Sequence, residues 1–181
     1  MKFYDCSTAP SPRRVRIFAA EKGINLPTVQ VDLRNGEQFS DAFRAINPDC
    51  TVPALVLDDG TVIADAVAIC GYLEELHPDP PLLPADPVER ARARLLVHRF
   101  DANLGDDYYA YRRGDANDLA GSLERLEVGQ SLYADVAYVP WVIRVRDMLG
   151  VSLPPAISSW LGELELRASV AAEVDVVRAL R

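Results

Sequence analysis

The stretch TVPALVLDDGTVIADA, residues 51–66, decides the fold. Two apolar runs, Pro53–Leu57 and Thr61–Ile63, flank the tripeptide Asp58-Asp59-Gly60. An Asp/Gly turn between apolar runs is a strong short-range signal for a β-hairpin. Directly after it, residues 65–76 carry apolar side chains at helical spacing. The stretch therefore predicts a hairpin that leads straight into a helix.

Upstream of the hairpin, the sequence alternates between strand and helix patterns. Residues 2–6 are short and aromatic, like a first strand, and residues 28–33 alternate with Val29, Val31 and Leu33 on one face, like a second strand. A helix is predicted over residues 12–23, with Ser11 as its cap, and a short helix over residues 40–46. Together with the hairpin, this order predicts an α/β first domain.

Downstream of residue 77, the composition changes. Five prolines lie between residues 78 and 87, which predicts a stiff linker. Everything after it has helical patterns, and the strongly apolar stretch 131–149 is expected to form the central helix, with a kink at Pro140. The predicted domains are therefore residues 1–77, a linker at 78–87, and an all-helical domain over 88–181. The other expected helices cover residues 88–113, 115–128 and a last stretch that opens at Pro154-Pro155.

Composition and charge exclude several classes of function. With 27 acidic and 19 basic residues, the net charge of −8 disfavours nucleic acid and anionic membrane surfaces as partners. We expect no transmembrane segment and no secretory leader, because no long apolar run and no basic, apolar N-terminus are present. Three cysteines without a C-x-x-C pair argue against a disulfide framework or a metal site, and for a reducing cytoplasm. The preference for arginine over lysine suggests a bacterial source.

Four segments resemble, in chain order, the cytosolic glutathione transferase family. PSPRRVRI with the following AEKG (residues 10–17 and 20–23) is similar to the family's first helix, and DAVAICGYLE (residues 65–74) to its third. FRAINP and TVPAL (residues 43–48 and 51–55) resemble the second helix and the cis-proline turn. The resemblance covers nearly all of residues 1–84 and continues more weakly from Ala134. It implies a thioredoxin-like domain with a mixed four-stranded sheet, followed by an all-α domain.

This resemblance also implies a set of residues that bind glutathione as co-substrate. The peptide backbone of glutathione would pair with Val52, the residue before a cis Pro53. The γ-glutamyl end would be held by Asp65-Ala66, where Ala66 lacks the hydroxyl that the family usually keeps. Gln38 would reach the glycyl end, or serve only as an exposed loop amide.

The group that stabilises the glutathione thiolate is expected at the N-terminus of the first helix, where the helix dipole also helps. The position at which several classes of the family keep Ser, Thr or Cys is Ala9 here. A cysteine of another class aligns with Ser11, which makes Ser11 the candidate stabiliser unless it is only a helix cap. Ser7, Thr8 and Cys6 are the local alternatives.

The electrophile is expected near the end of the long helix, where the family builds that pocket. Four residues there are candidates, which otherwise serve packing or a dimer edge: Tyr108, Tyr109, Tyr111 and Arg112. Arg13 and Arg16 are expected to form a solvated basic face rather than to attract glutathione. Asp135 is expected to cap a helix rather than to catalyse.

The resemblance implies a glutathione-dependent transferase that acts on a small electrophile by conjugation, thiolytic cleavage or isomerisation, and a homodimer. The departures at Ala9 and Ala66 and the short helical half favour an alternative, a non-catalytic binding or scaffold protein. A third possibility is an enzyme that uses another thiol.

Overall fold

The computed structural model describes residues 1–180, which form two compact units. The first unit ends at Pro80 and the second begins at Pro81, inside the proline-rich segment. Among the described residues, no helix is both long enough and apolar enough to cross a bilayer.

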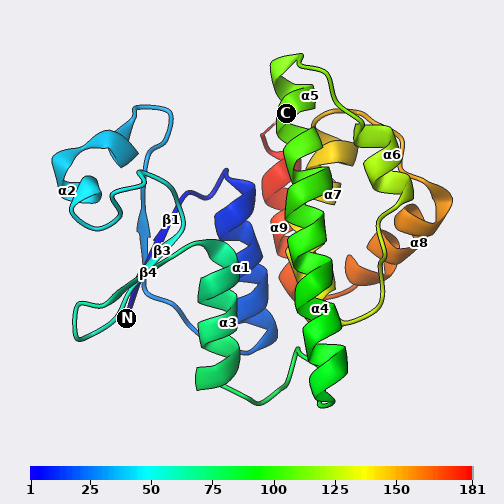
Figure 1. The fold of residues 1–181 in the computed structure, drawn as a ribbon. Coiled ribbons are helices and arrows are strands. Elements are labelled where there is room, and N and C mark those ends of the chain that lie inside the picture. Colours follow the sequence, from blue (N-terminus) through cyan, green and yellow to red (C-terminus); the bar gives the residue numbers. More distant parts are fainter. Residues whose placement is uncertain (181) are drawn as a thin grey trace. The chain divides into compact units, whose positions relative to one another are not determined.

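The first unit is a mixed four-stranded sheet with helices on both faces (Figure 1). The strand order is β2-β1-β3-β4, with β1 and β2 parallel and the other two pairs antiparallel, so the predicted sheet is confirmed. The elements are β1 (Lys2–Asp5), α1 (Pro10–Glu21), β2 (Thr28–Gln30), the 3₁₀ turn η1 (Glu37–Phe39), α2 (Asp41–Arg44), β3 (Ala54–Val56), β4 (Val62–Ala64) and α3 (Ala66–Leu76).

Helices α1 and α3 lie side by side against one face of the sheet, and α2 lies on the other face (Figure 1). Val15, Ile17 and Ile69 are fully buried on the two helices, as is Leu55 on β3. Burying such side chains contributes about 1.5–3 kcal/mol each. These four side chains therefore pack the two helices against the sheet.

The N-terminus of α1 differs from the prediction. The helix begins at Pro10, Ala9 is its N-cap without a side-chain hydrogen bond, and Ser11 lies inside the first turn. The prediction that Ser11 caps the helix is wrong. Proline costs nothing at the first helical position because the missing N–H has no partner there, so the helix starts one proline earlier than Pro12.

Strand β2 is also shorter than predicted. It ends at Gln30, all three of its residues are exposed, and Val29 is 39% exposed while Val31 is buried. The predicted shared face of Val29 and Val31 is therefore wrong. As the edge strand of the sheet, β2 has a partner on one side only, so its side chains are not enclosed.

The second unit is entirely helical over its described residues, as predicted. It contains α4 (Pro87–Phe100), the π-helical segment η2 (Asp101–Gly105), α5 (Asp106–Arg113), α6 (Leu119–Glu124), α7 (Leu132–Asp147), α8 (Pro155–Leu164) and α9 (Ala168–Arg178). Helix α7 is buried along almost its whole length and contacts α4, α8 and α9. The predicted central helix is confirmed, with Pro140 inside it.

Candidate functional site

The register of the sheet gathers the predicted binding segments at one end of the first unit. Tyr4 pairs with Ala54, and Ala54 pairs with Ala64. The turn that follows β1, the Val52-Pro53 segment before β3 and Asp65 after β4 are therefore neighbours. Strand β2 runs parallel to β1, so its last residue, Gln30, reaches the same end. Residues that are up to about sixty positions apart in the chain therefore lie together at one end of the sheet.

The peptide bond between Val52 and Pro53 is cis, which confirms the prediction. Within residues 1–180, neither the amide nor the carbonyl of Val52 takes part in a hydrogen bond, and the residue is half-buried. Both polar groups can therefore pair with an extended peptide, as in an antiparallel ladder.

Asp65 is the N-cap of α3, with a φ of +81° that few residues other than glycine adopt. Its Oδ1 accepts hydrogen bonds from the amides of Val67 at 2.8 Å and Ala68 at 3.0 Å. Its Oδ2 accepts none from residues 1–180, and the side chain is exposed. One carboxylate oxygen thus serves the helix, while the other remains available to a cation. Ala66, the next residue, is buried and offers no hydroxyl.

Gln38 lies in η1 and is half-buried. Its Oε1 is enclosed and has no hydrogen-bond partner in the part of the chain that the structure describes. A buried acceptor without a donor is uncommon and costs free energy, so an N–H group brought by a ligand would stabilise it.

The candidate thiolate stabilisers lie in and beside one turn, residues 6–9, closed by a 2.9 Å hydrogen bond from the Ala9 amide to the Cys6 carbonyl. Cys6 is buried, and its Sγ lies 3.3 Å from Thr8 Oγ1. Ser7 is exposed, and Ser11 is half-buried in the first turn of α1. The structure therefore brings all four candidates to the entry of one helix without setting one apart.

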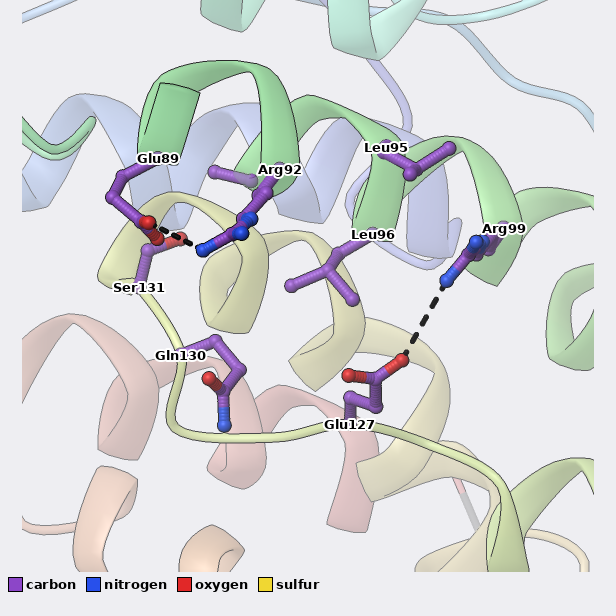
Figure 2. A pocket seen from close by; sticks show the side chains of 9 residues that line it. Glu89, Arg92, Leu95, Leu96, Arg99, Glu127, Gln130 and Ser131 are labelled. Carbon is purple, nitrogen blue, oxygen red and sulfur yellow. Dashed lines mark hydrogen bonds and ion pairs between the residues drawn. The ribbon is translucent and has the colours of Figure 1, made fainter. Parts of the chain in front are cut away.

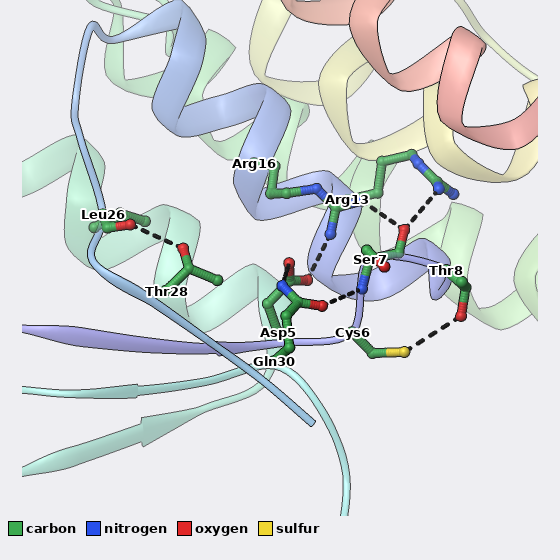
Figure 3. Close-up of polar contacts among 9 residues, drawn as sticks. All are labelled: Asp5, Cys6, Ser7, Thr8, Arg13, Arg16, Leu26, Thr28 and Gln30. Carbon is green, nitrogen blue, oxygen red and sulfur yellow. Dashed lines mark hydrogen bonds and ion pairs between the residues drawn. The ribbon is translucent and has the colours of Figure 1, made fainter. Parts of the chain in front are cut away.

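Two arginines of α1 hold this turn instead of forming a solvated face, so that prediction is wrong (Figure 3). Arg13 is 0% exposed, and its Nη2 donates to the Ser7 carbonyl at 3.1 Å. Arg16 donates to the same carbonyl at 3.1 Å and to the carboxylate of Asp5. The acceptors come from the end of β1, which the helical spacing of the arginines alone does not reveal.

In the second unit, the four predicted pocket residues separate into two groups. Tyr108 is 0% exposed, and its hydroxyl accepts a 2.7 Å hydrogen bond from Arg144 Nε, so it packs in the core. Tyr109, Tyr111 and Arg112 are exposed on α5. Only these three can meet a ligand directly.

The second unit also contains a cavity of about 380 Å³ between α4 and the segment that precedes α7 (Figure 2). Leu96 points into it, while Arg92 pairs with Glu89 at 2.6 Å and Arg99 lies 3.7 Å from Glu127. These opposite charges compensate one another, and none of the predicted site residues lines the cavity. Over residues 1–180, no group of three His, Cys, Asp or Glu side chains is placed to hold a metal ion.

Comparison with known proteins identifies the family. The family model for the glutathione S-transferase N-terminal domain matches residues 8–76. The solved structure of a glutathione S-transferase domain-containing protein from Marinobacter aquaeolei VT8 is 30% identical, covers 94% of this chain and all of its own, and superposes with a TM-score of 0.80. The chain belongs to the glutathione S-transferase family.

Several further relatives match about half of this chain. Glutathione S-transferase Z1 of Arabidopsis thaliana is 46% identical over 50% of this chain and 41% of its own. A maleylacetoacetate isomerase of Pseudomonas aeruginosa is 43% identical over 52% of this chain and 45% of its own. The matches thus span less than half the length of these relatives. The holo structure of a bacterial maleyl pyruvate isomerase is 25% identical, covers 96% of each chain and has a TM-score of 0.74.

Proposed function

We propose that this protein is a glutathione-dependent transferase whose reaction is the isomerisation of a small electrophile. One observation carries the glutathione part. Val52, whose backbone groups are unpaired, and Asp65, whose Oδ2 accepts no hydrogen bond from residues 1–180, lie at the same end of the sheet, within the segment that the family model matches. The first can align the peptide of glutathione, and the second can receive its γ-glutamyl ammonium. Gln38 would accept an N–H from the ligand.

Isomerisation is favoured because relatives named maleylacetoacetate isomerase match this part of the chain. In the proposed reaction, the glutathione thiolate adds to a cis carbon–carbon double bond conjugated to a carbonyl. The electron pair moves onto the carbonyl oxygen as an enolate, and the former double bond rotates. Expulsion of the thiolate then restores the double bond as trans and returns glutathione unchanged.

Ser11 is the proposed hydrogen-bond donor to the thiolate, with Ser7, Thr8 and Cys6 as alternatives in the same turn. Each unit by which the thiol pKa falls corresponds to about 1.4 kcal/mol of selective stabilisation of the thiolate. The exposed residues of α5, Tyr109, Tyr111 and Arg112, are the proposed contacts of the electrophile, and the guanidinium of Arg112 suits a carboxylate. Homodimerisation and a cytoplasmic location belong to the same proposal, and sedimentation velocity tests the first.

The first experiment is a calorimetric titration with reduced glutathione, which we expect to give saturable one-to-one binding. Turnover of maleylacetoacetate is then measured for the wild type and for Ser11→Ala. We expect a fall of at least about tenfold with unchanged folding, since one donor to a developing anion contributes that much or more. Unchanged turnover would move the role to Ser7, Thr8 or Cys6, tested by the same substitution.

A second candidate function is a non-catalytic binding protein. It is favoured by Ala9 and Ala66, which carry no hydroxyl at positions where the family usually has one. Absence of binding at millimolar glutathione would support this candidate and overturn the first.

A further inference from the structure

We propose that Asp5 and Gln30 are positioning residues that fix the turn over residues 6–9, and with it the groups that stabilise the thiolate. The inference rests on the proposed function for what the turn does. The hydrogen bonds that fix the turn do not depend on that function.

A chain of hydrogen bonds leads from the buried end of β1 to the turn (Figure 3). The Ser7 amide donates to Gln30 Oε1 at 2.9 Å, and Gln30 Nε2 donates to Asp5 Oδ2 at 2.7 Å. The other oxygen of Asp5 accepts from Arg16. Since Arg13 and Arg16 both donate to the Ser7 carbonyl, side chains hold both polar groups of the Ser7 backbone.

We call the chain of hydrogen bonds Asp5–Gln30–Ser7 the relay. The carboxylate of Asp5 determines which group donates and which accepts along it. Asp5 is 1% exposed, and an ionised carboxylate can only accept hydrogen bonds. Gln30 must therefore turn its NH₂ group toward Asp5, which leaves its oxygen facing the Ser7 amide. A charge buried at the end of β1 thus determines which atom of the edge strand β2 meets the turn.

Arg13 and Arg16 support the turn from α1, and Gln30 supports it from the sheet. Ser7 is exposed, and the cap of α1 is Ala9, which makes no side-chain hydrogen bond. Groups that stabilise a reacting atom must be held within about 0.5 Å of their productive position. A misplacement of about 1 Å can cost on the order of a hundredfold in rate. Asp5 and Gln30 would prevent that displacement without touching substrate.

Reversal of the relay provides a sharp test. In Asp5→Asn one side-chain oxygen must serve both Arg16 and Gln30, so the new NH₂ group meets one of these two donors. In Gln30→Glu the new carboxylate faces the carboxylate of Asp5. In the double variant Asp5→Asn/Gln30→Glu, the asparagine donates to the glutamate, whose other oxygen again accepts from the Ser7 amide. Net charge is unchanged in the double variant, and Arg16 keeps an oxygen partner at position 5.

We expect each single variant to lower kcat about tenfold or more, with the KM for glutathione changed less than about threefold. The acid limb of the pH profile, which reports the pKa of the bound thiol, should shift to higher pH. The double variant should restore kcat and the position of the acid limb, as coupled residues do in a double-mutant cycle. If Asp5→Asn does not fold, Gln30→Met is the second variant. It changes an exposed residue, breaks both hydrogen bonds of Gln30 and leaves the Asp5–Arg16 pair in place.

Asp32→Asn is the matched control. Asp32 accepts from the side-chain amide of Asn35 at 2.7 Å, a pair of the same kind in the loop after β2 and outside the relay. We expect its kinetics to match the wild type.

Amide hydrogen exchange of Ser7, measured without glutathione, separates this inference from the proposed function. Exchange should be faster in the single variants and slow again in the double variant, whether or not the protein turns over a substrate. A protein that binds no glutathione but shows this pattern keeps the relay and loses the proposed function. Unchanged Ser7 exchange and turnover in the single variants, or a double variant no better than either, would overturn the relay.

Discussion

Asp65 divides its two carboxylate oxygens between a helix and open solvent, so Asp65→Asn separates the two roles. Asparagine caps a helix about as well as aspartate, so stability should change by less than about 1 kcal/mol. The lost charge weakens the pairing with the γ-glutamyl ammonium, because hydrogen bonds between charged groups are worth about 1.5–3 kcal/mol. We expect the glutathione Kd to rise about tenfold or more in calorimetry.

Asp86 offers a control of the same chemistry. It is the N-cap of α4 in the second unit, and its Oδ1 accepts from the amides of Val88 at 2.9 Å and Glu89 at 3.0 Å. Asp86→Asn therefore makes the same change at an equivalent cap that is not one of the proposed site residues. Equal loss of glutathione affinity in both variants would show that charge at a cap acts through stability, and Asp65 would leave the proposed site.

At the level of single residues, the sequence is informative where a signal is local. The cis bond at Pro53 was expected because TVPAL resembles the cis-proline turn of the family, a motif that is local in the chain. Asp5 and Gln30 give no such signal, because 25 positions separate them and only the register of β1 with β2 brings them together. Arg16 is misassigned for the same reason, since its partner Asp5 lies across the turn and not on its own helix.

The ends of α1 and α3 are joined by one buried cation, which makes a prediction for these elements. The Lys22 ammonium pairs with Glu74 and donates to the carbonyls of His77 at 2.6 Å and Pro80 at 2.8 Å, and its side chain is 0% exposed. Lys22→Met leaves the Glu74 carboxylate buried without its lysine, which costs roughly 3–5 kcal/mol. Urea unfolding at neutral pH measures this loss.

The matched variant is Lys22→Met/Glu74→Leu, in which the pair is replaced by apolar side chains. It should recover most of the loss, because well-packed apolar residues often replace a buried ion pair at no cost. If the double variant is as unstable as the single one, the hydrogen bonds to His77 and Pro80 and not the ion pair hold these helix ends.

A buried carboxylate near the N-terminus of α7 should make the free energy of unfolding depend on pH. The N-cap of α7 is Ser131 and not Asp135, so the expectation that Asp135 caps the helix is wrong. The Asp135 carboxylate instead accepts from the Gly129 amide of the preceding loop at 2.9 Å. Burial raises the pKa of Asp135 above its ordinary value of 3.8. Its contribution to the free energy of unfolding is therefore full below the unfolded pKa and falls as pH rises through the folded pKa.

Asp135→Asn removes this titration and keeps an oxygen for the Gly129 amide. Relative to the wild type, the variant should become more stable as the pH rises from about 4 to 7, because the unfavourable charge is gone. Denaturant unfolding at several pH values measures the difference. A stability difference that is constant over this range would show that the pKa is not raised.

Element order was more predictable than element boundaries. The hairpin, α3 and the central helix follow from periodicity and turn residues, and all appear where expected. The helix predicted over residues 88–113 contains the π-helical segment η2, which apolar spacing does not encode. There the side-chain amide of Asn103 donates to the Arg99 carbonyl, and such competition for backbone groups is a known cause of helix irregularity.

At the scale of the molecule, the two units are organised by different elements, the first by its sheet and the second by a central helix. The first builds its candidate site from strand ends, so the site depends on sheet register. The second is organised around α7, whose residues are buried on all sides. Family resemblance in the sequence is concentrated in the first unit, where the family model also matches.

If all groups that bind glutathione lie in the first unit, the ligand should stabilise that unit selectively. A ligand at a hundred times its Kd adds about 2.7 kcal/mol to the state that binds it, which slows exchange through unfolding on the order of a hundredfold. Hydrogen exchange with and without saturating glutathione should therefore show this slowing in α1 and α3, and little change in α7 and α9. The Asp65→Asn variant, at the same ligand concentration, should show a smaller effect in the same helices. Equal slowing in both units would mean that they unfold as one cooperative block or that the second unit supplies part of the binding energy.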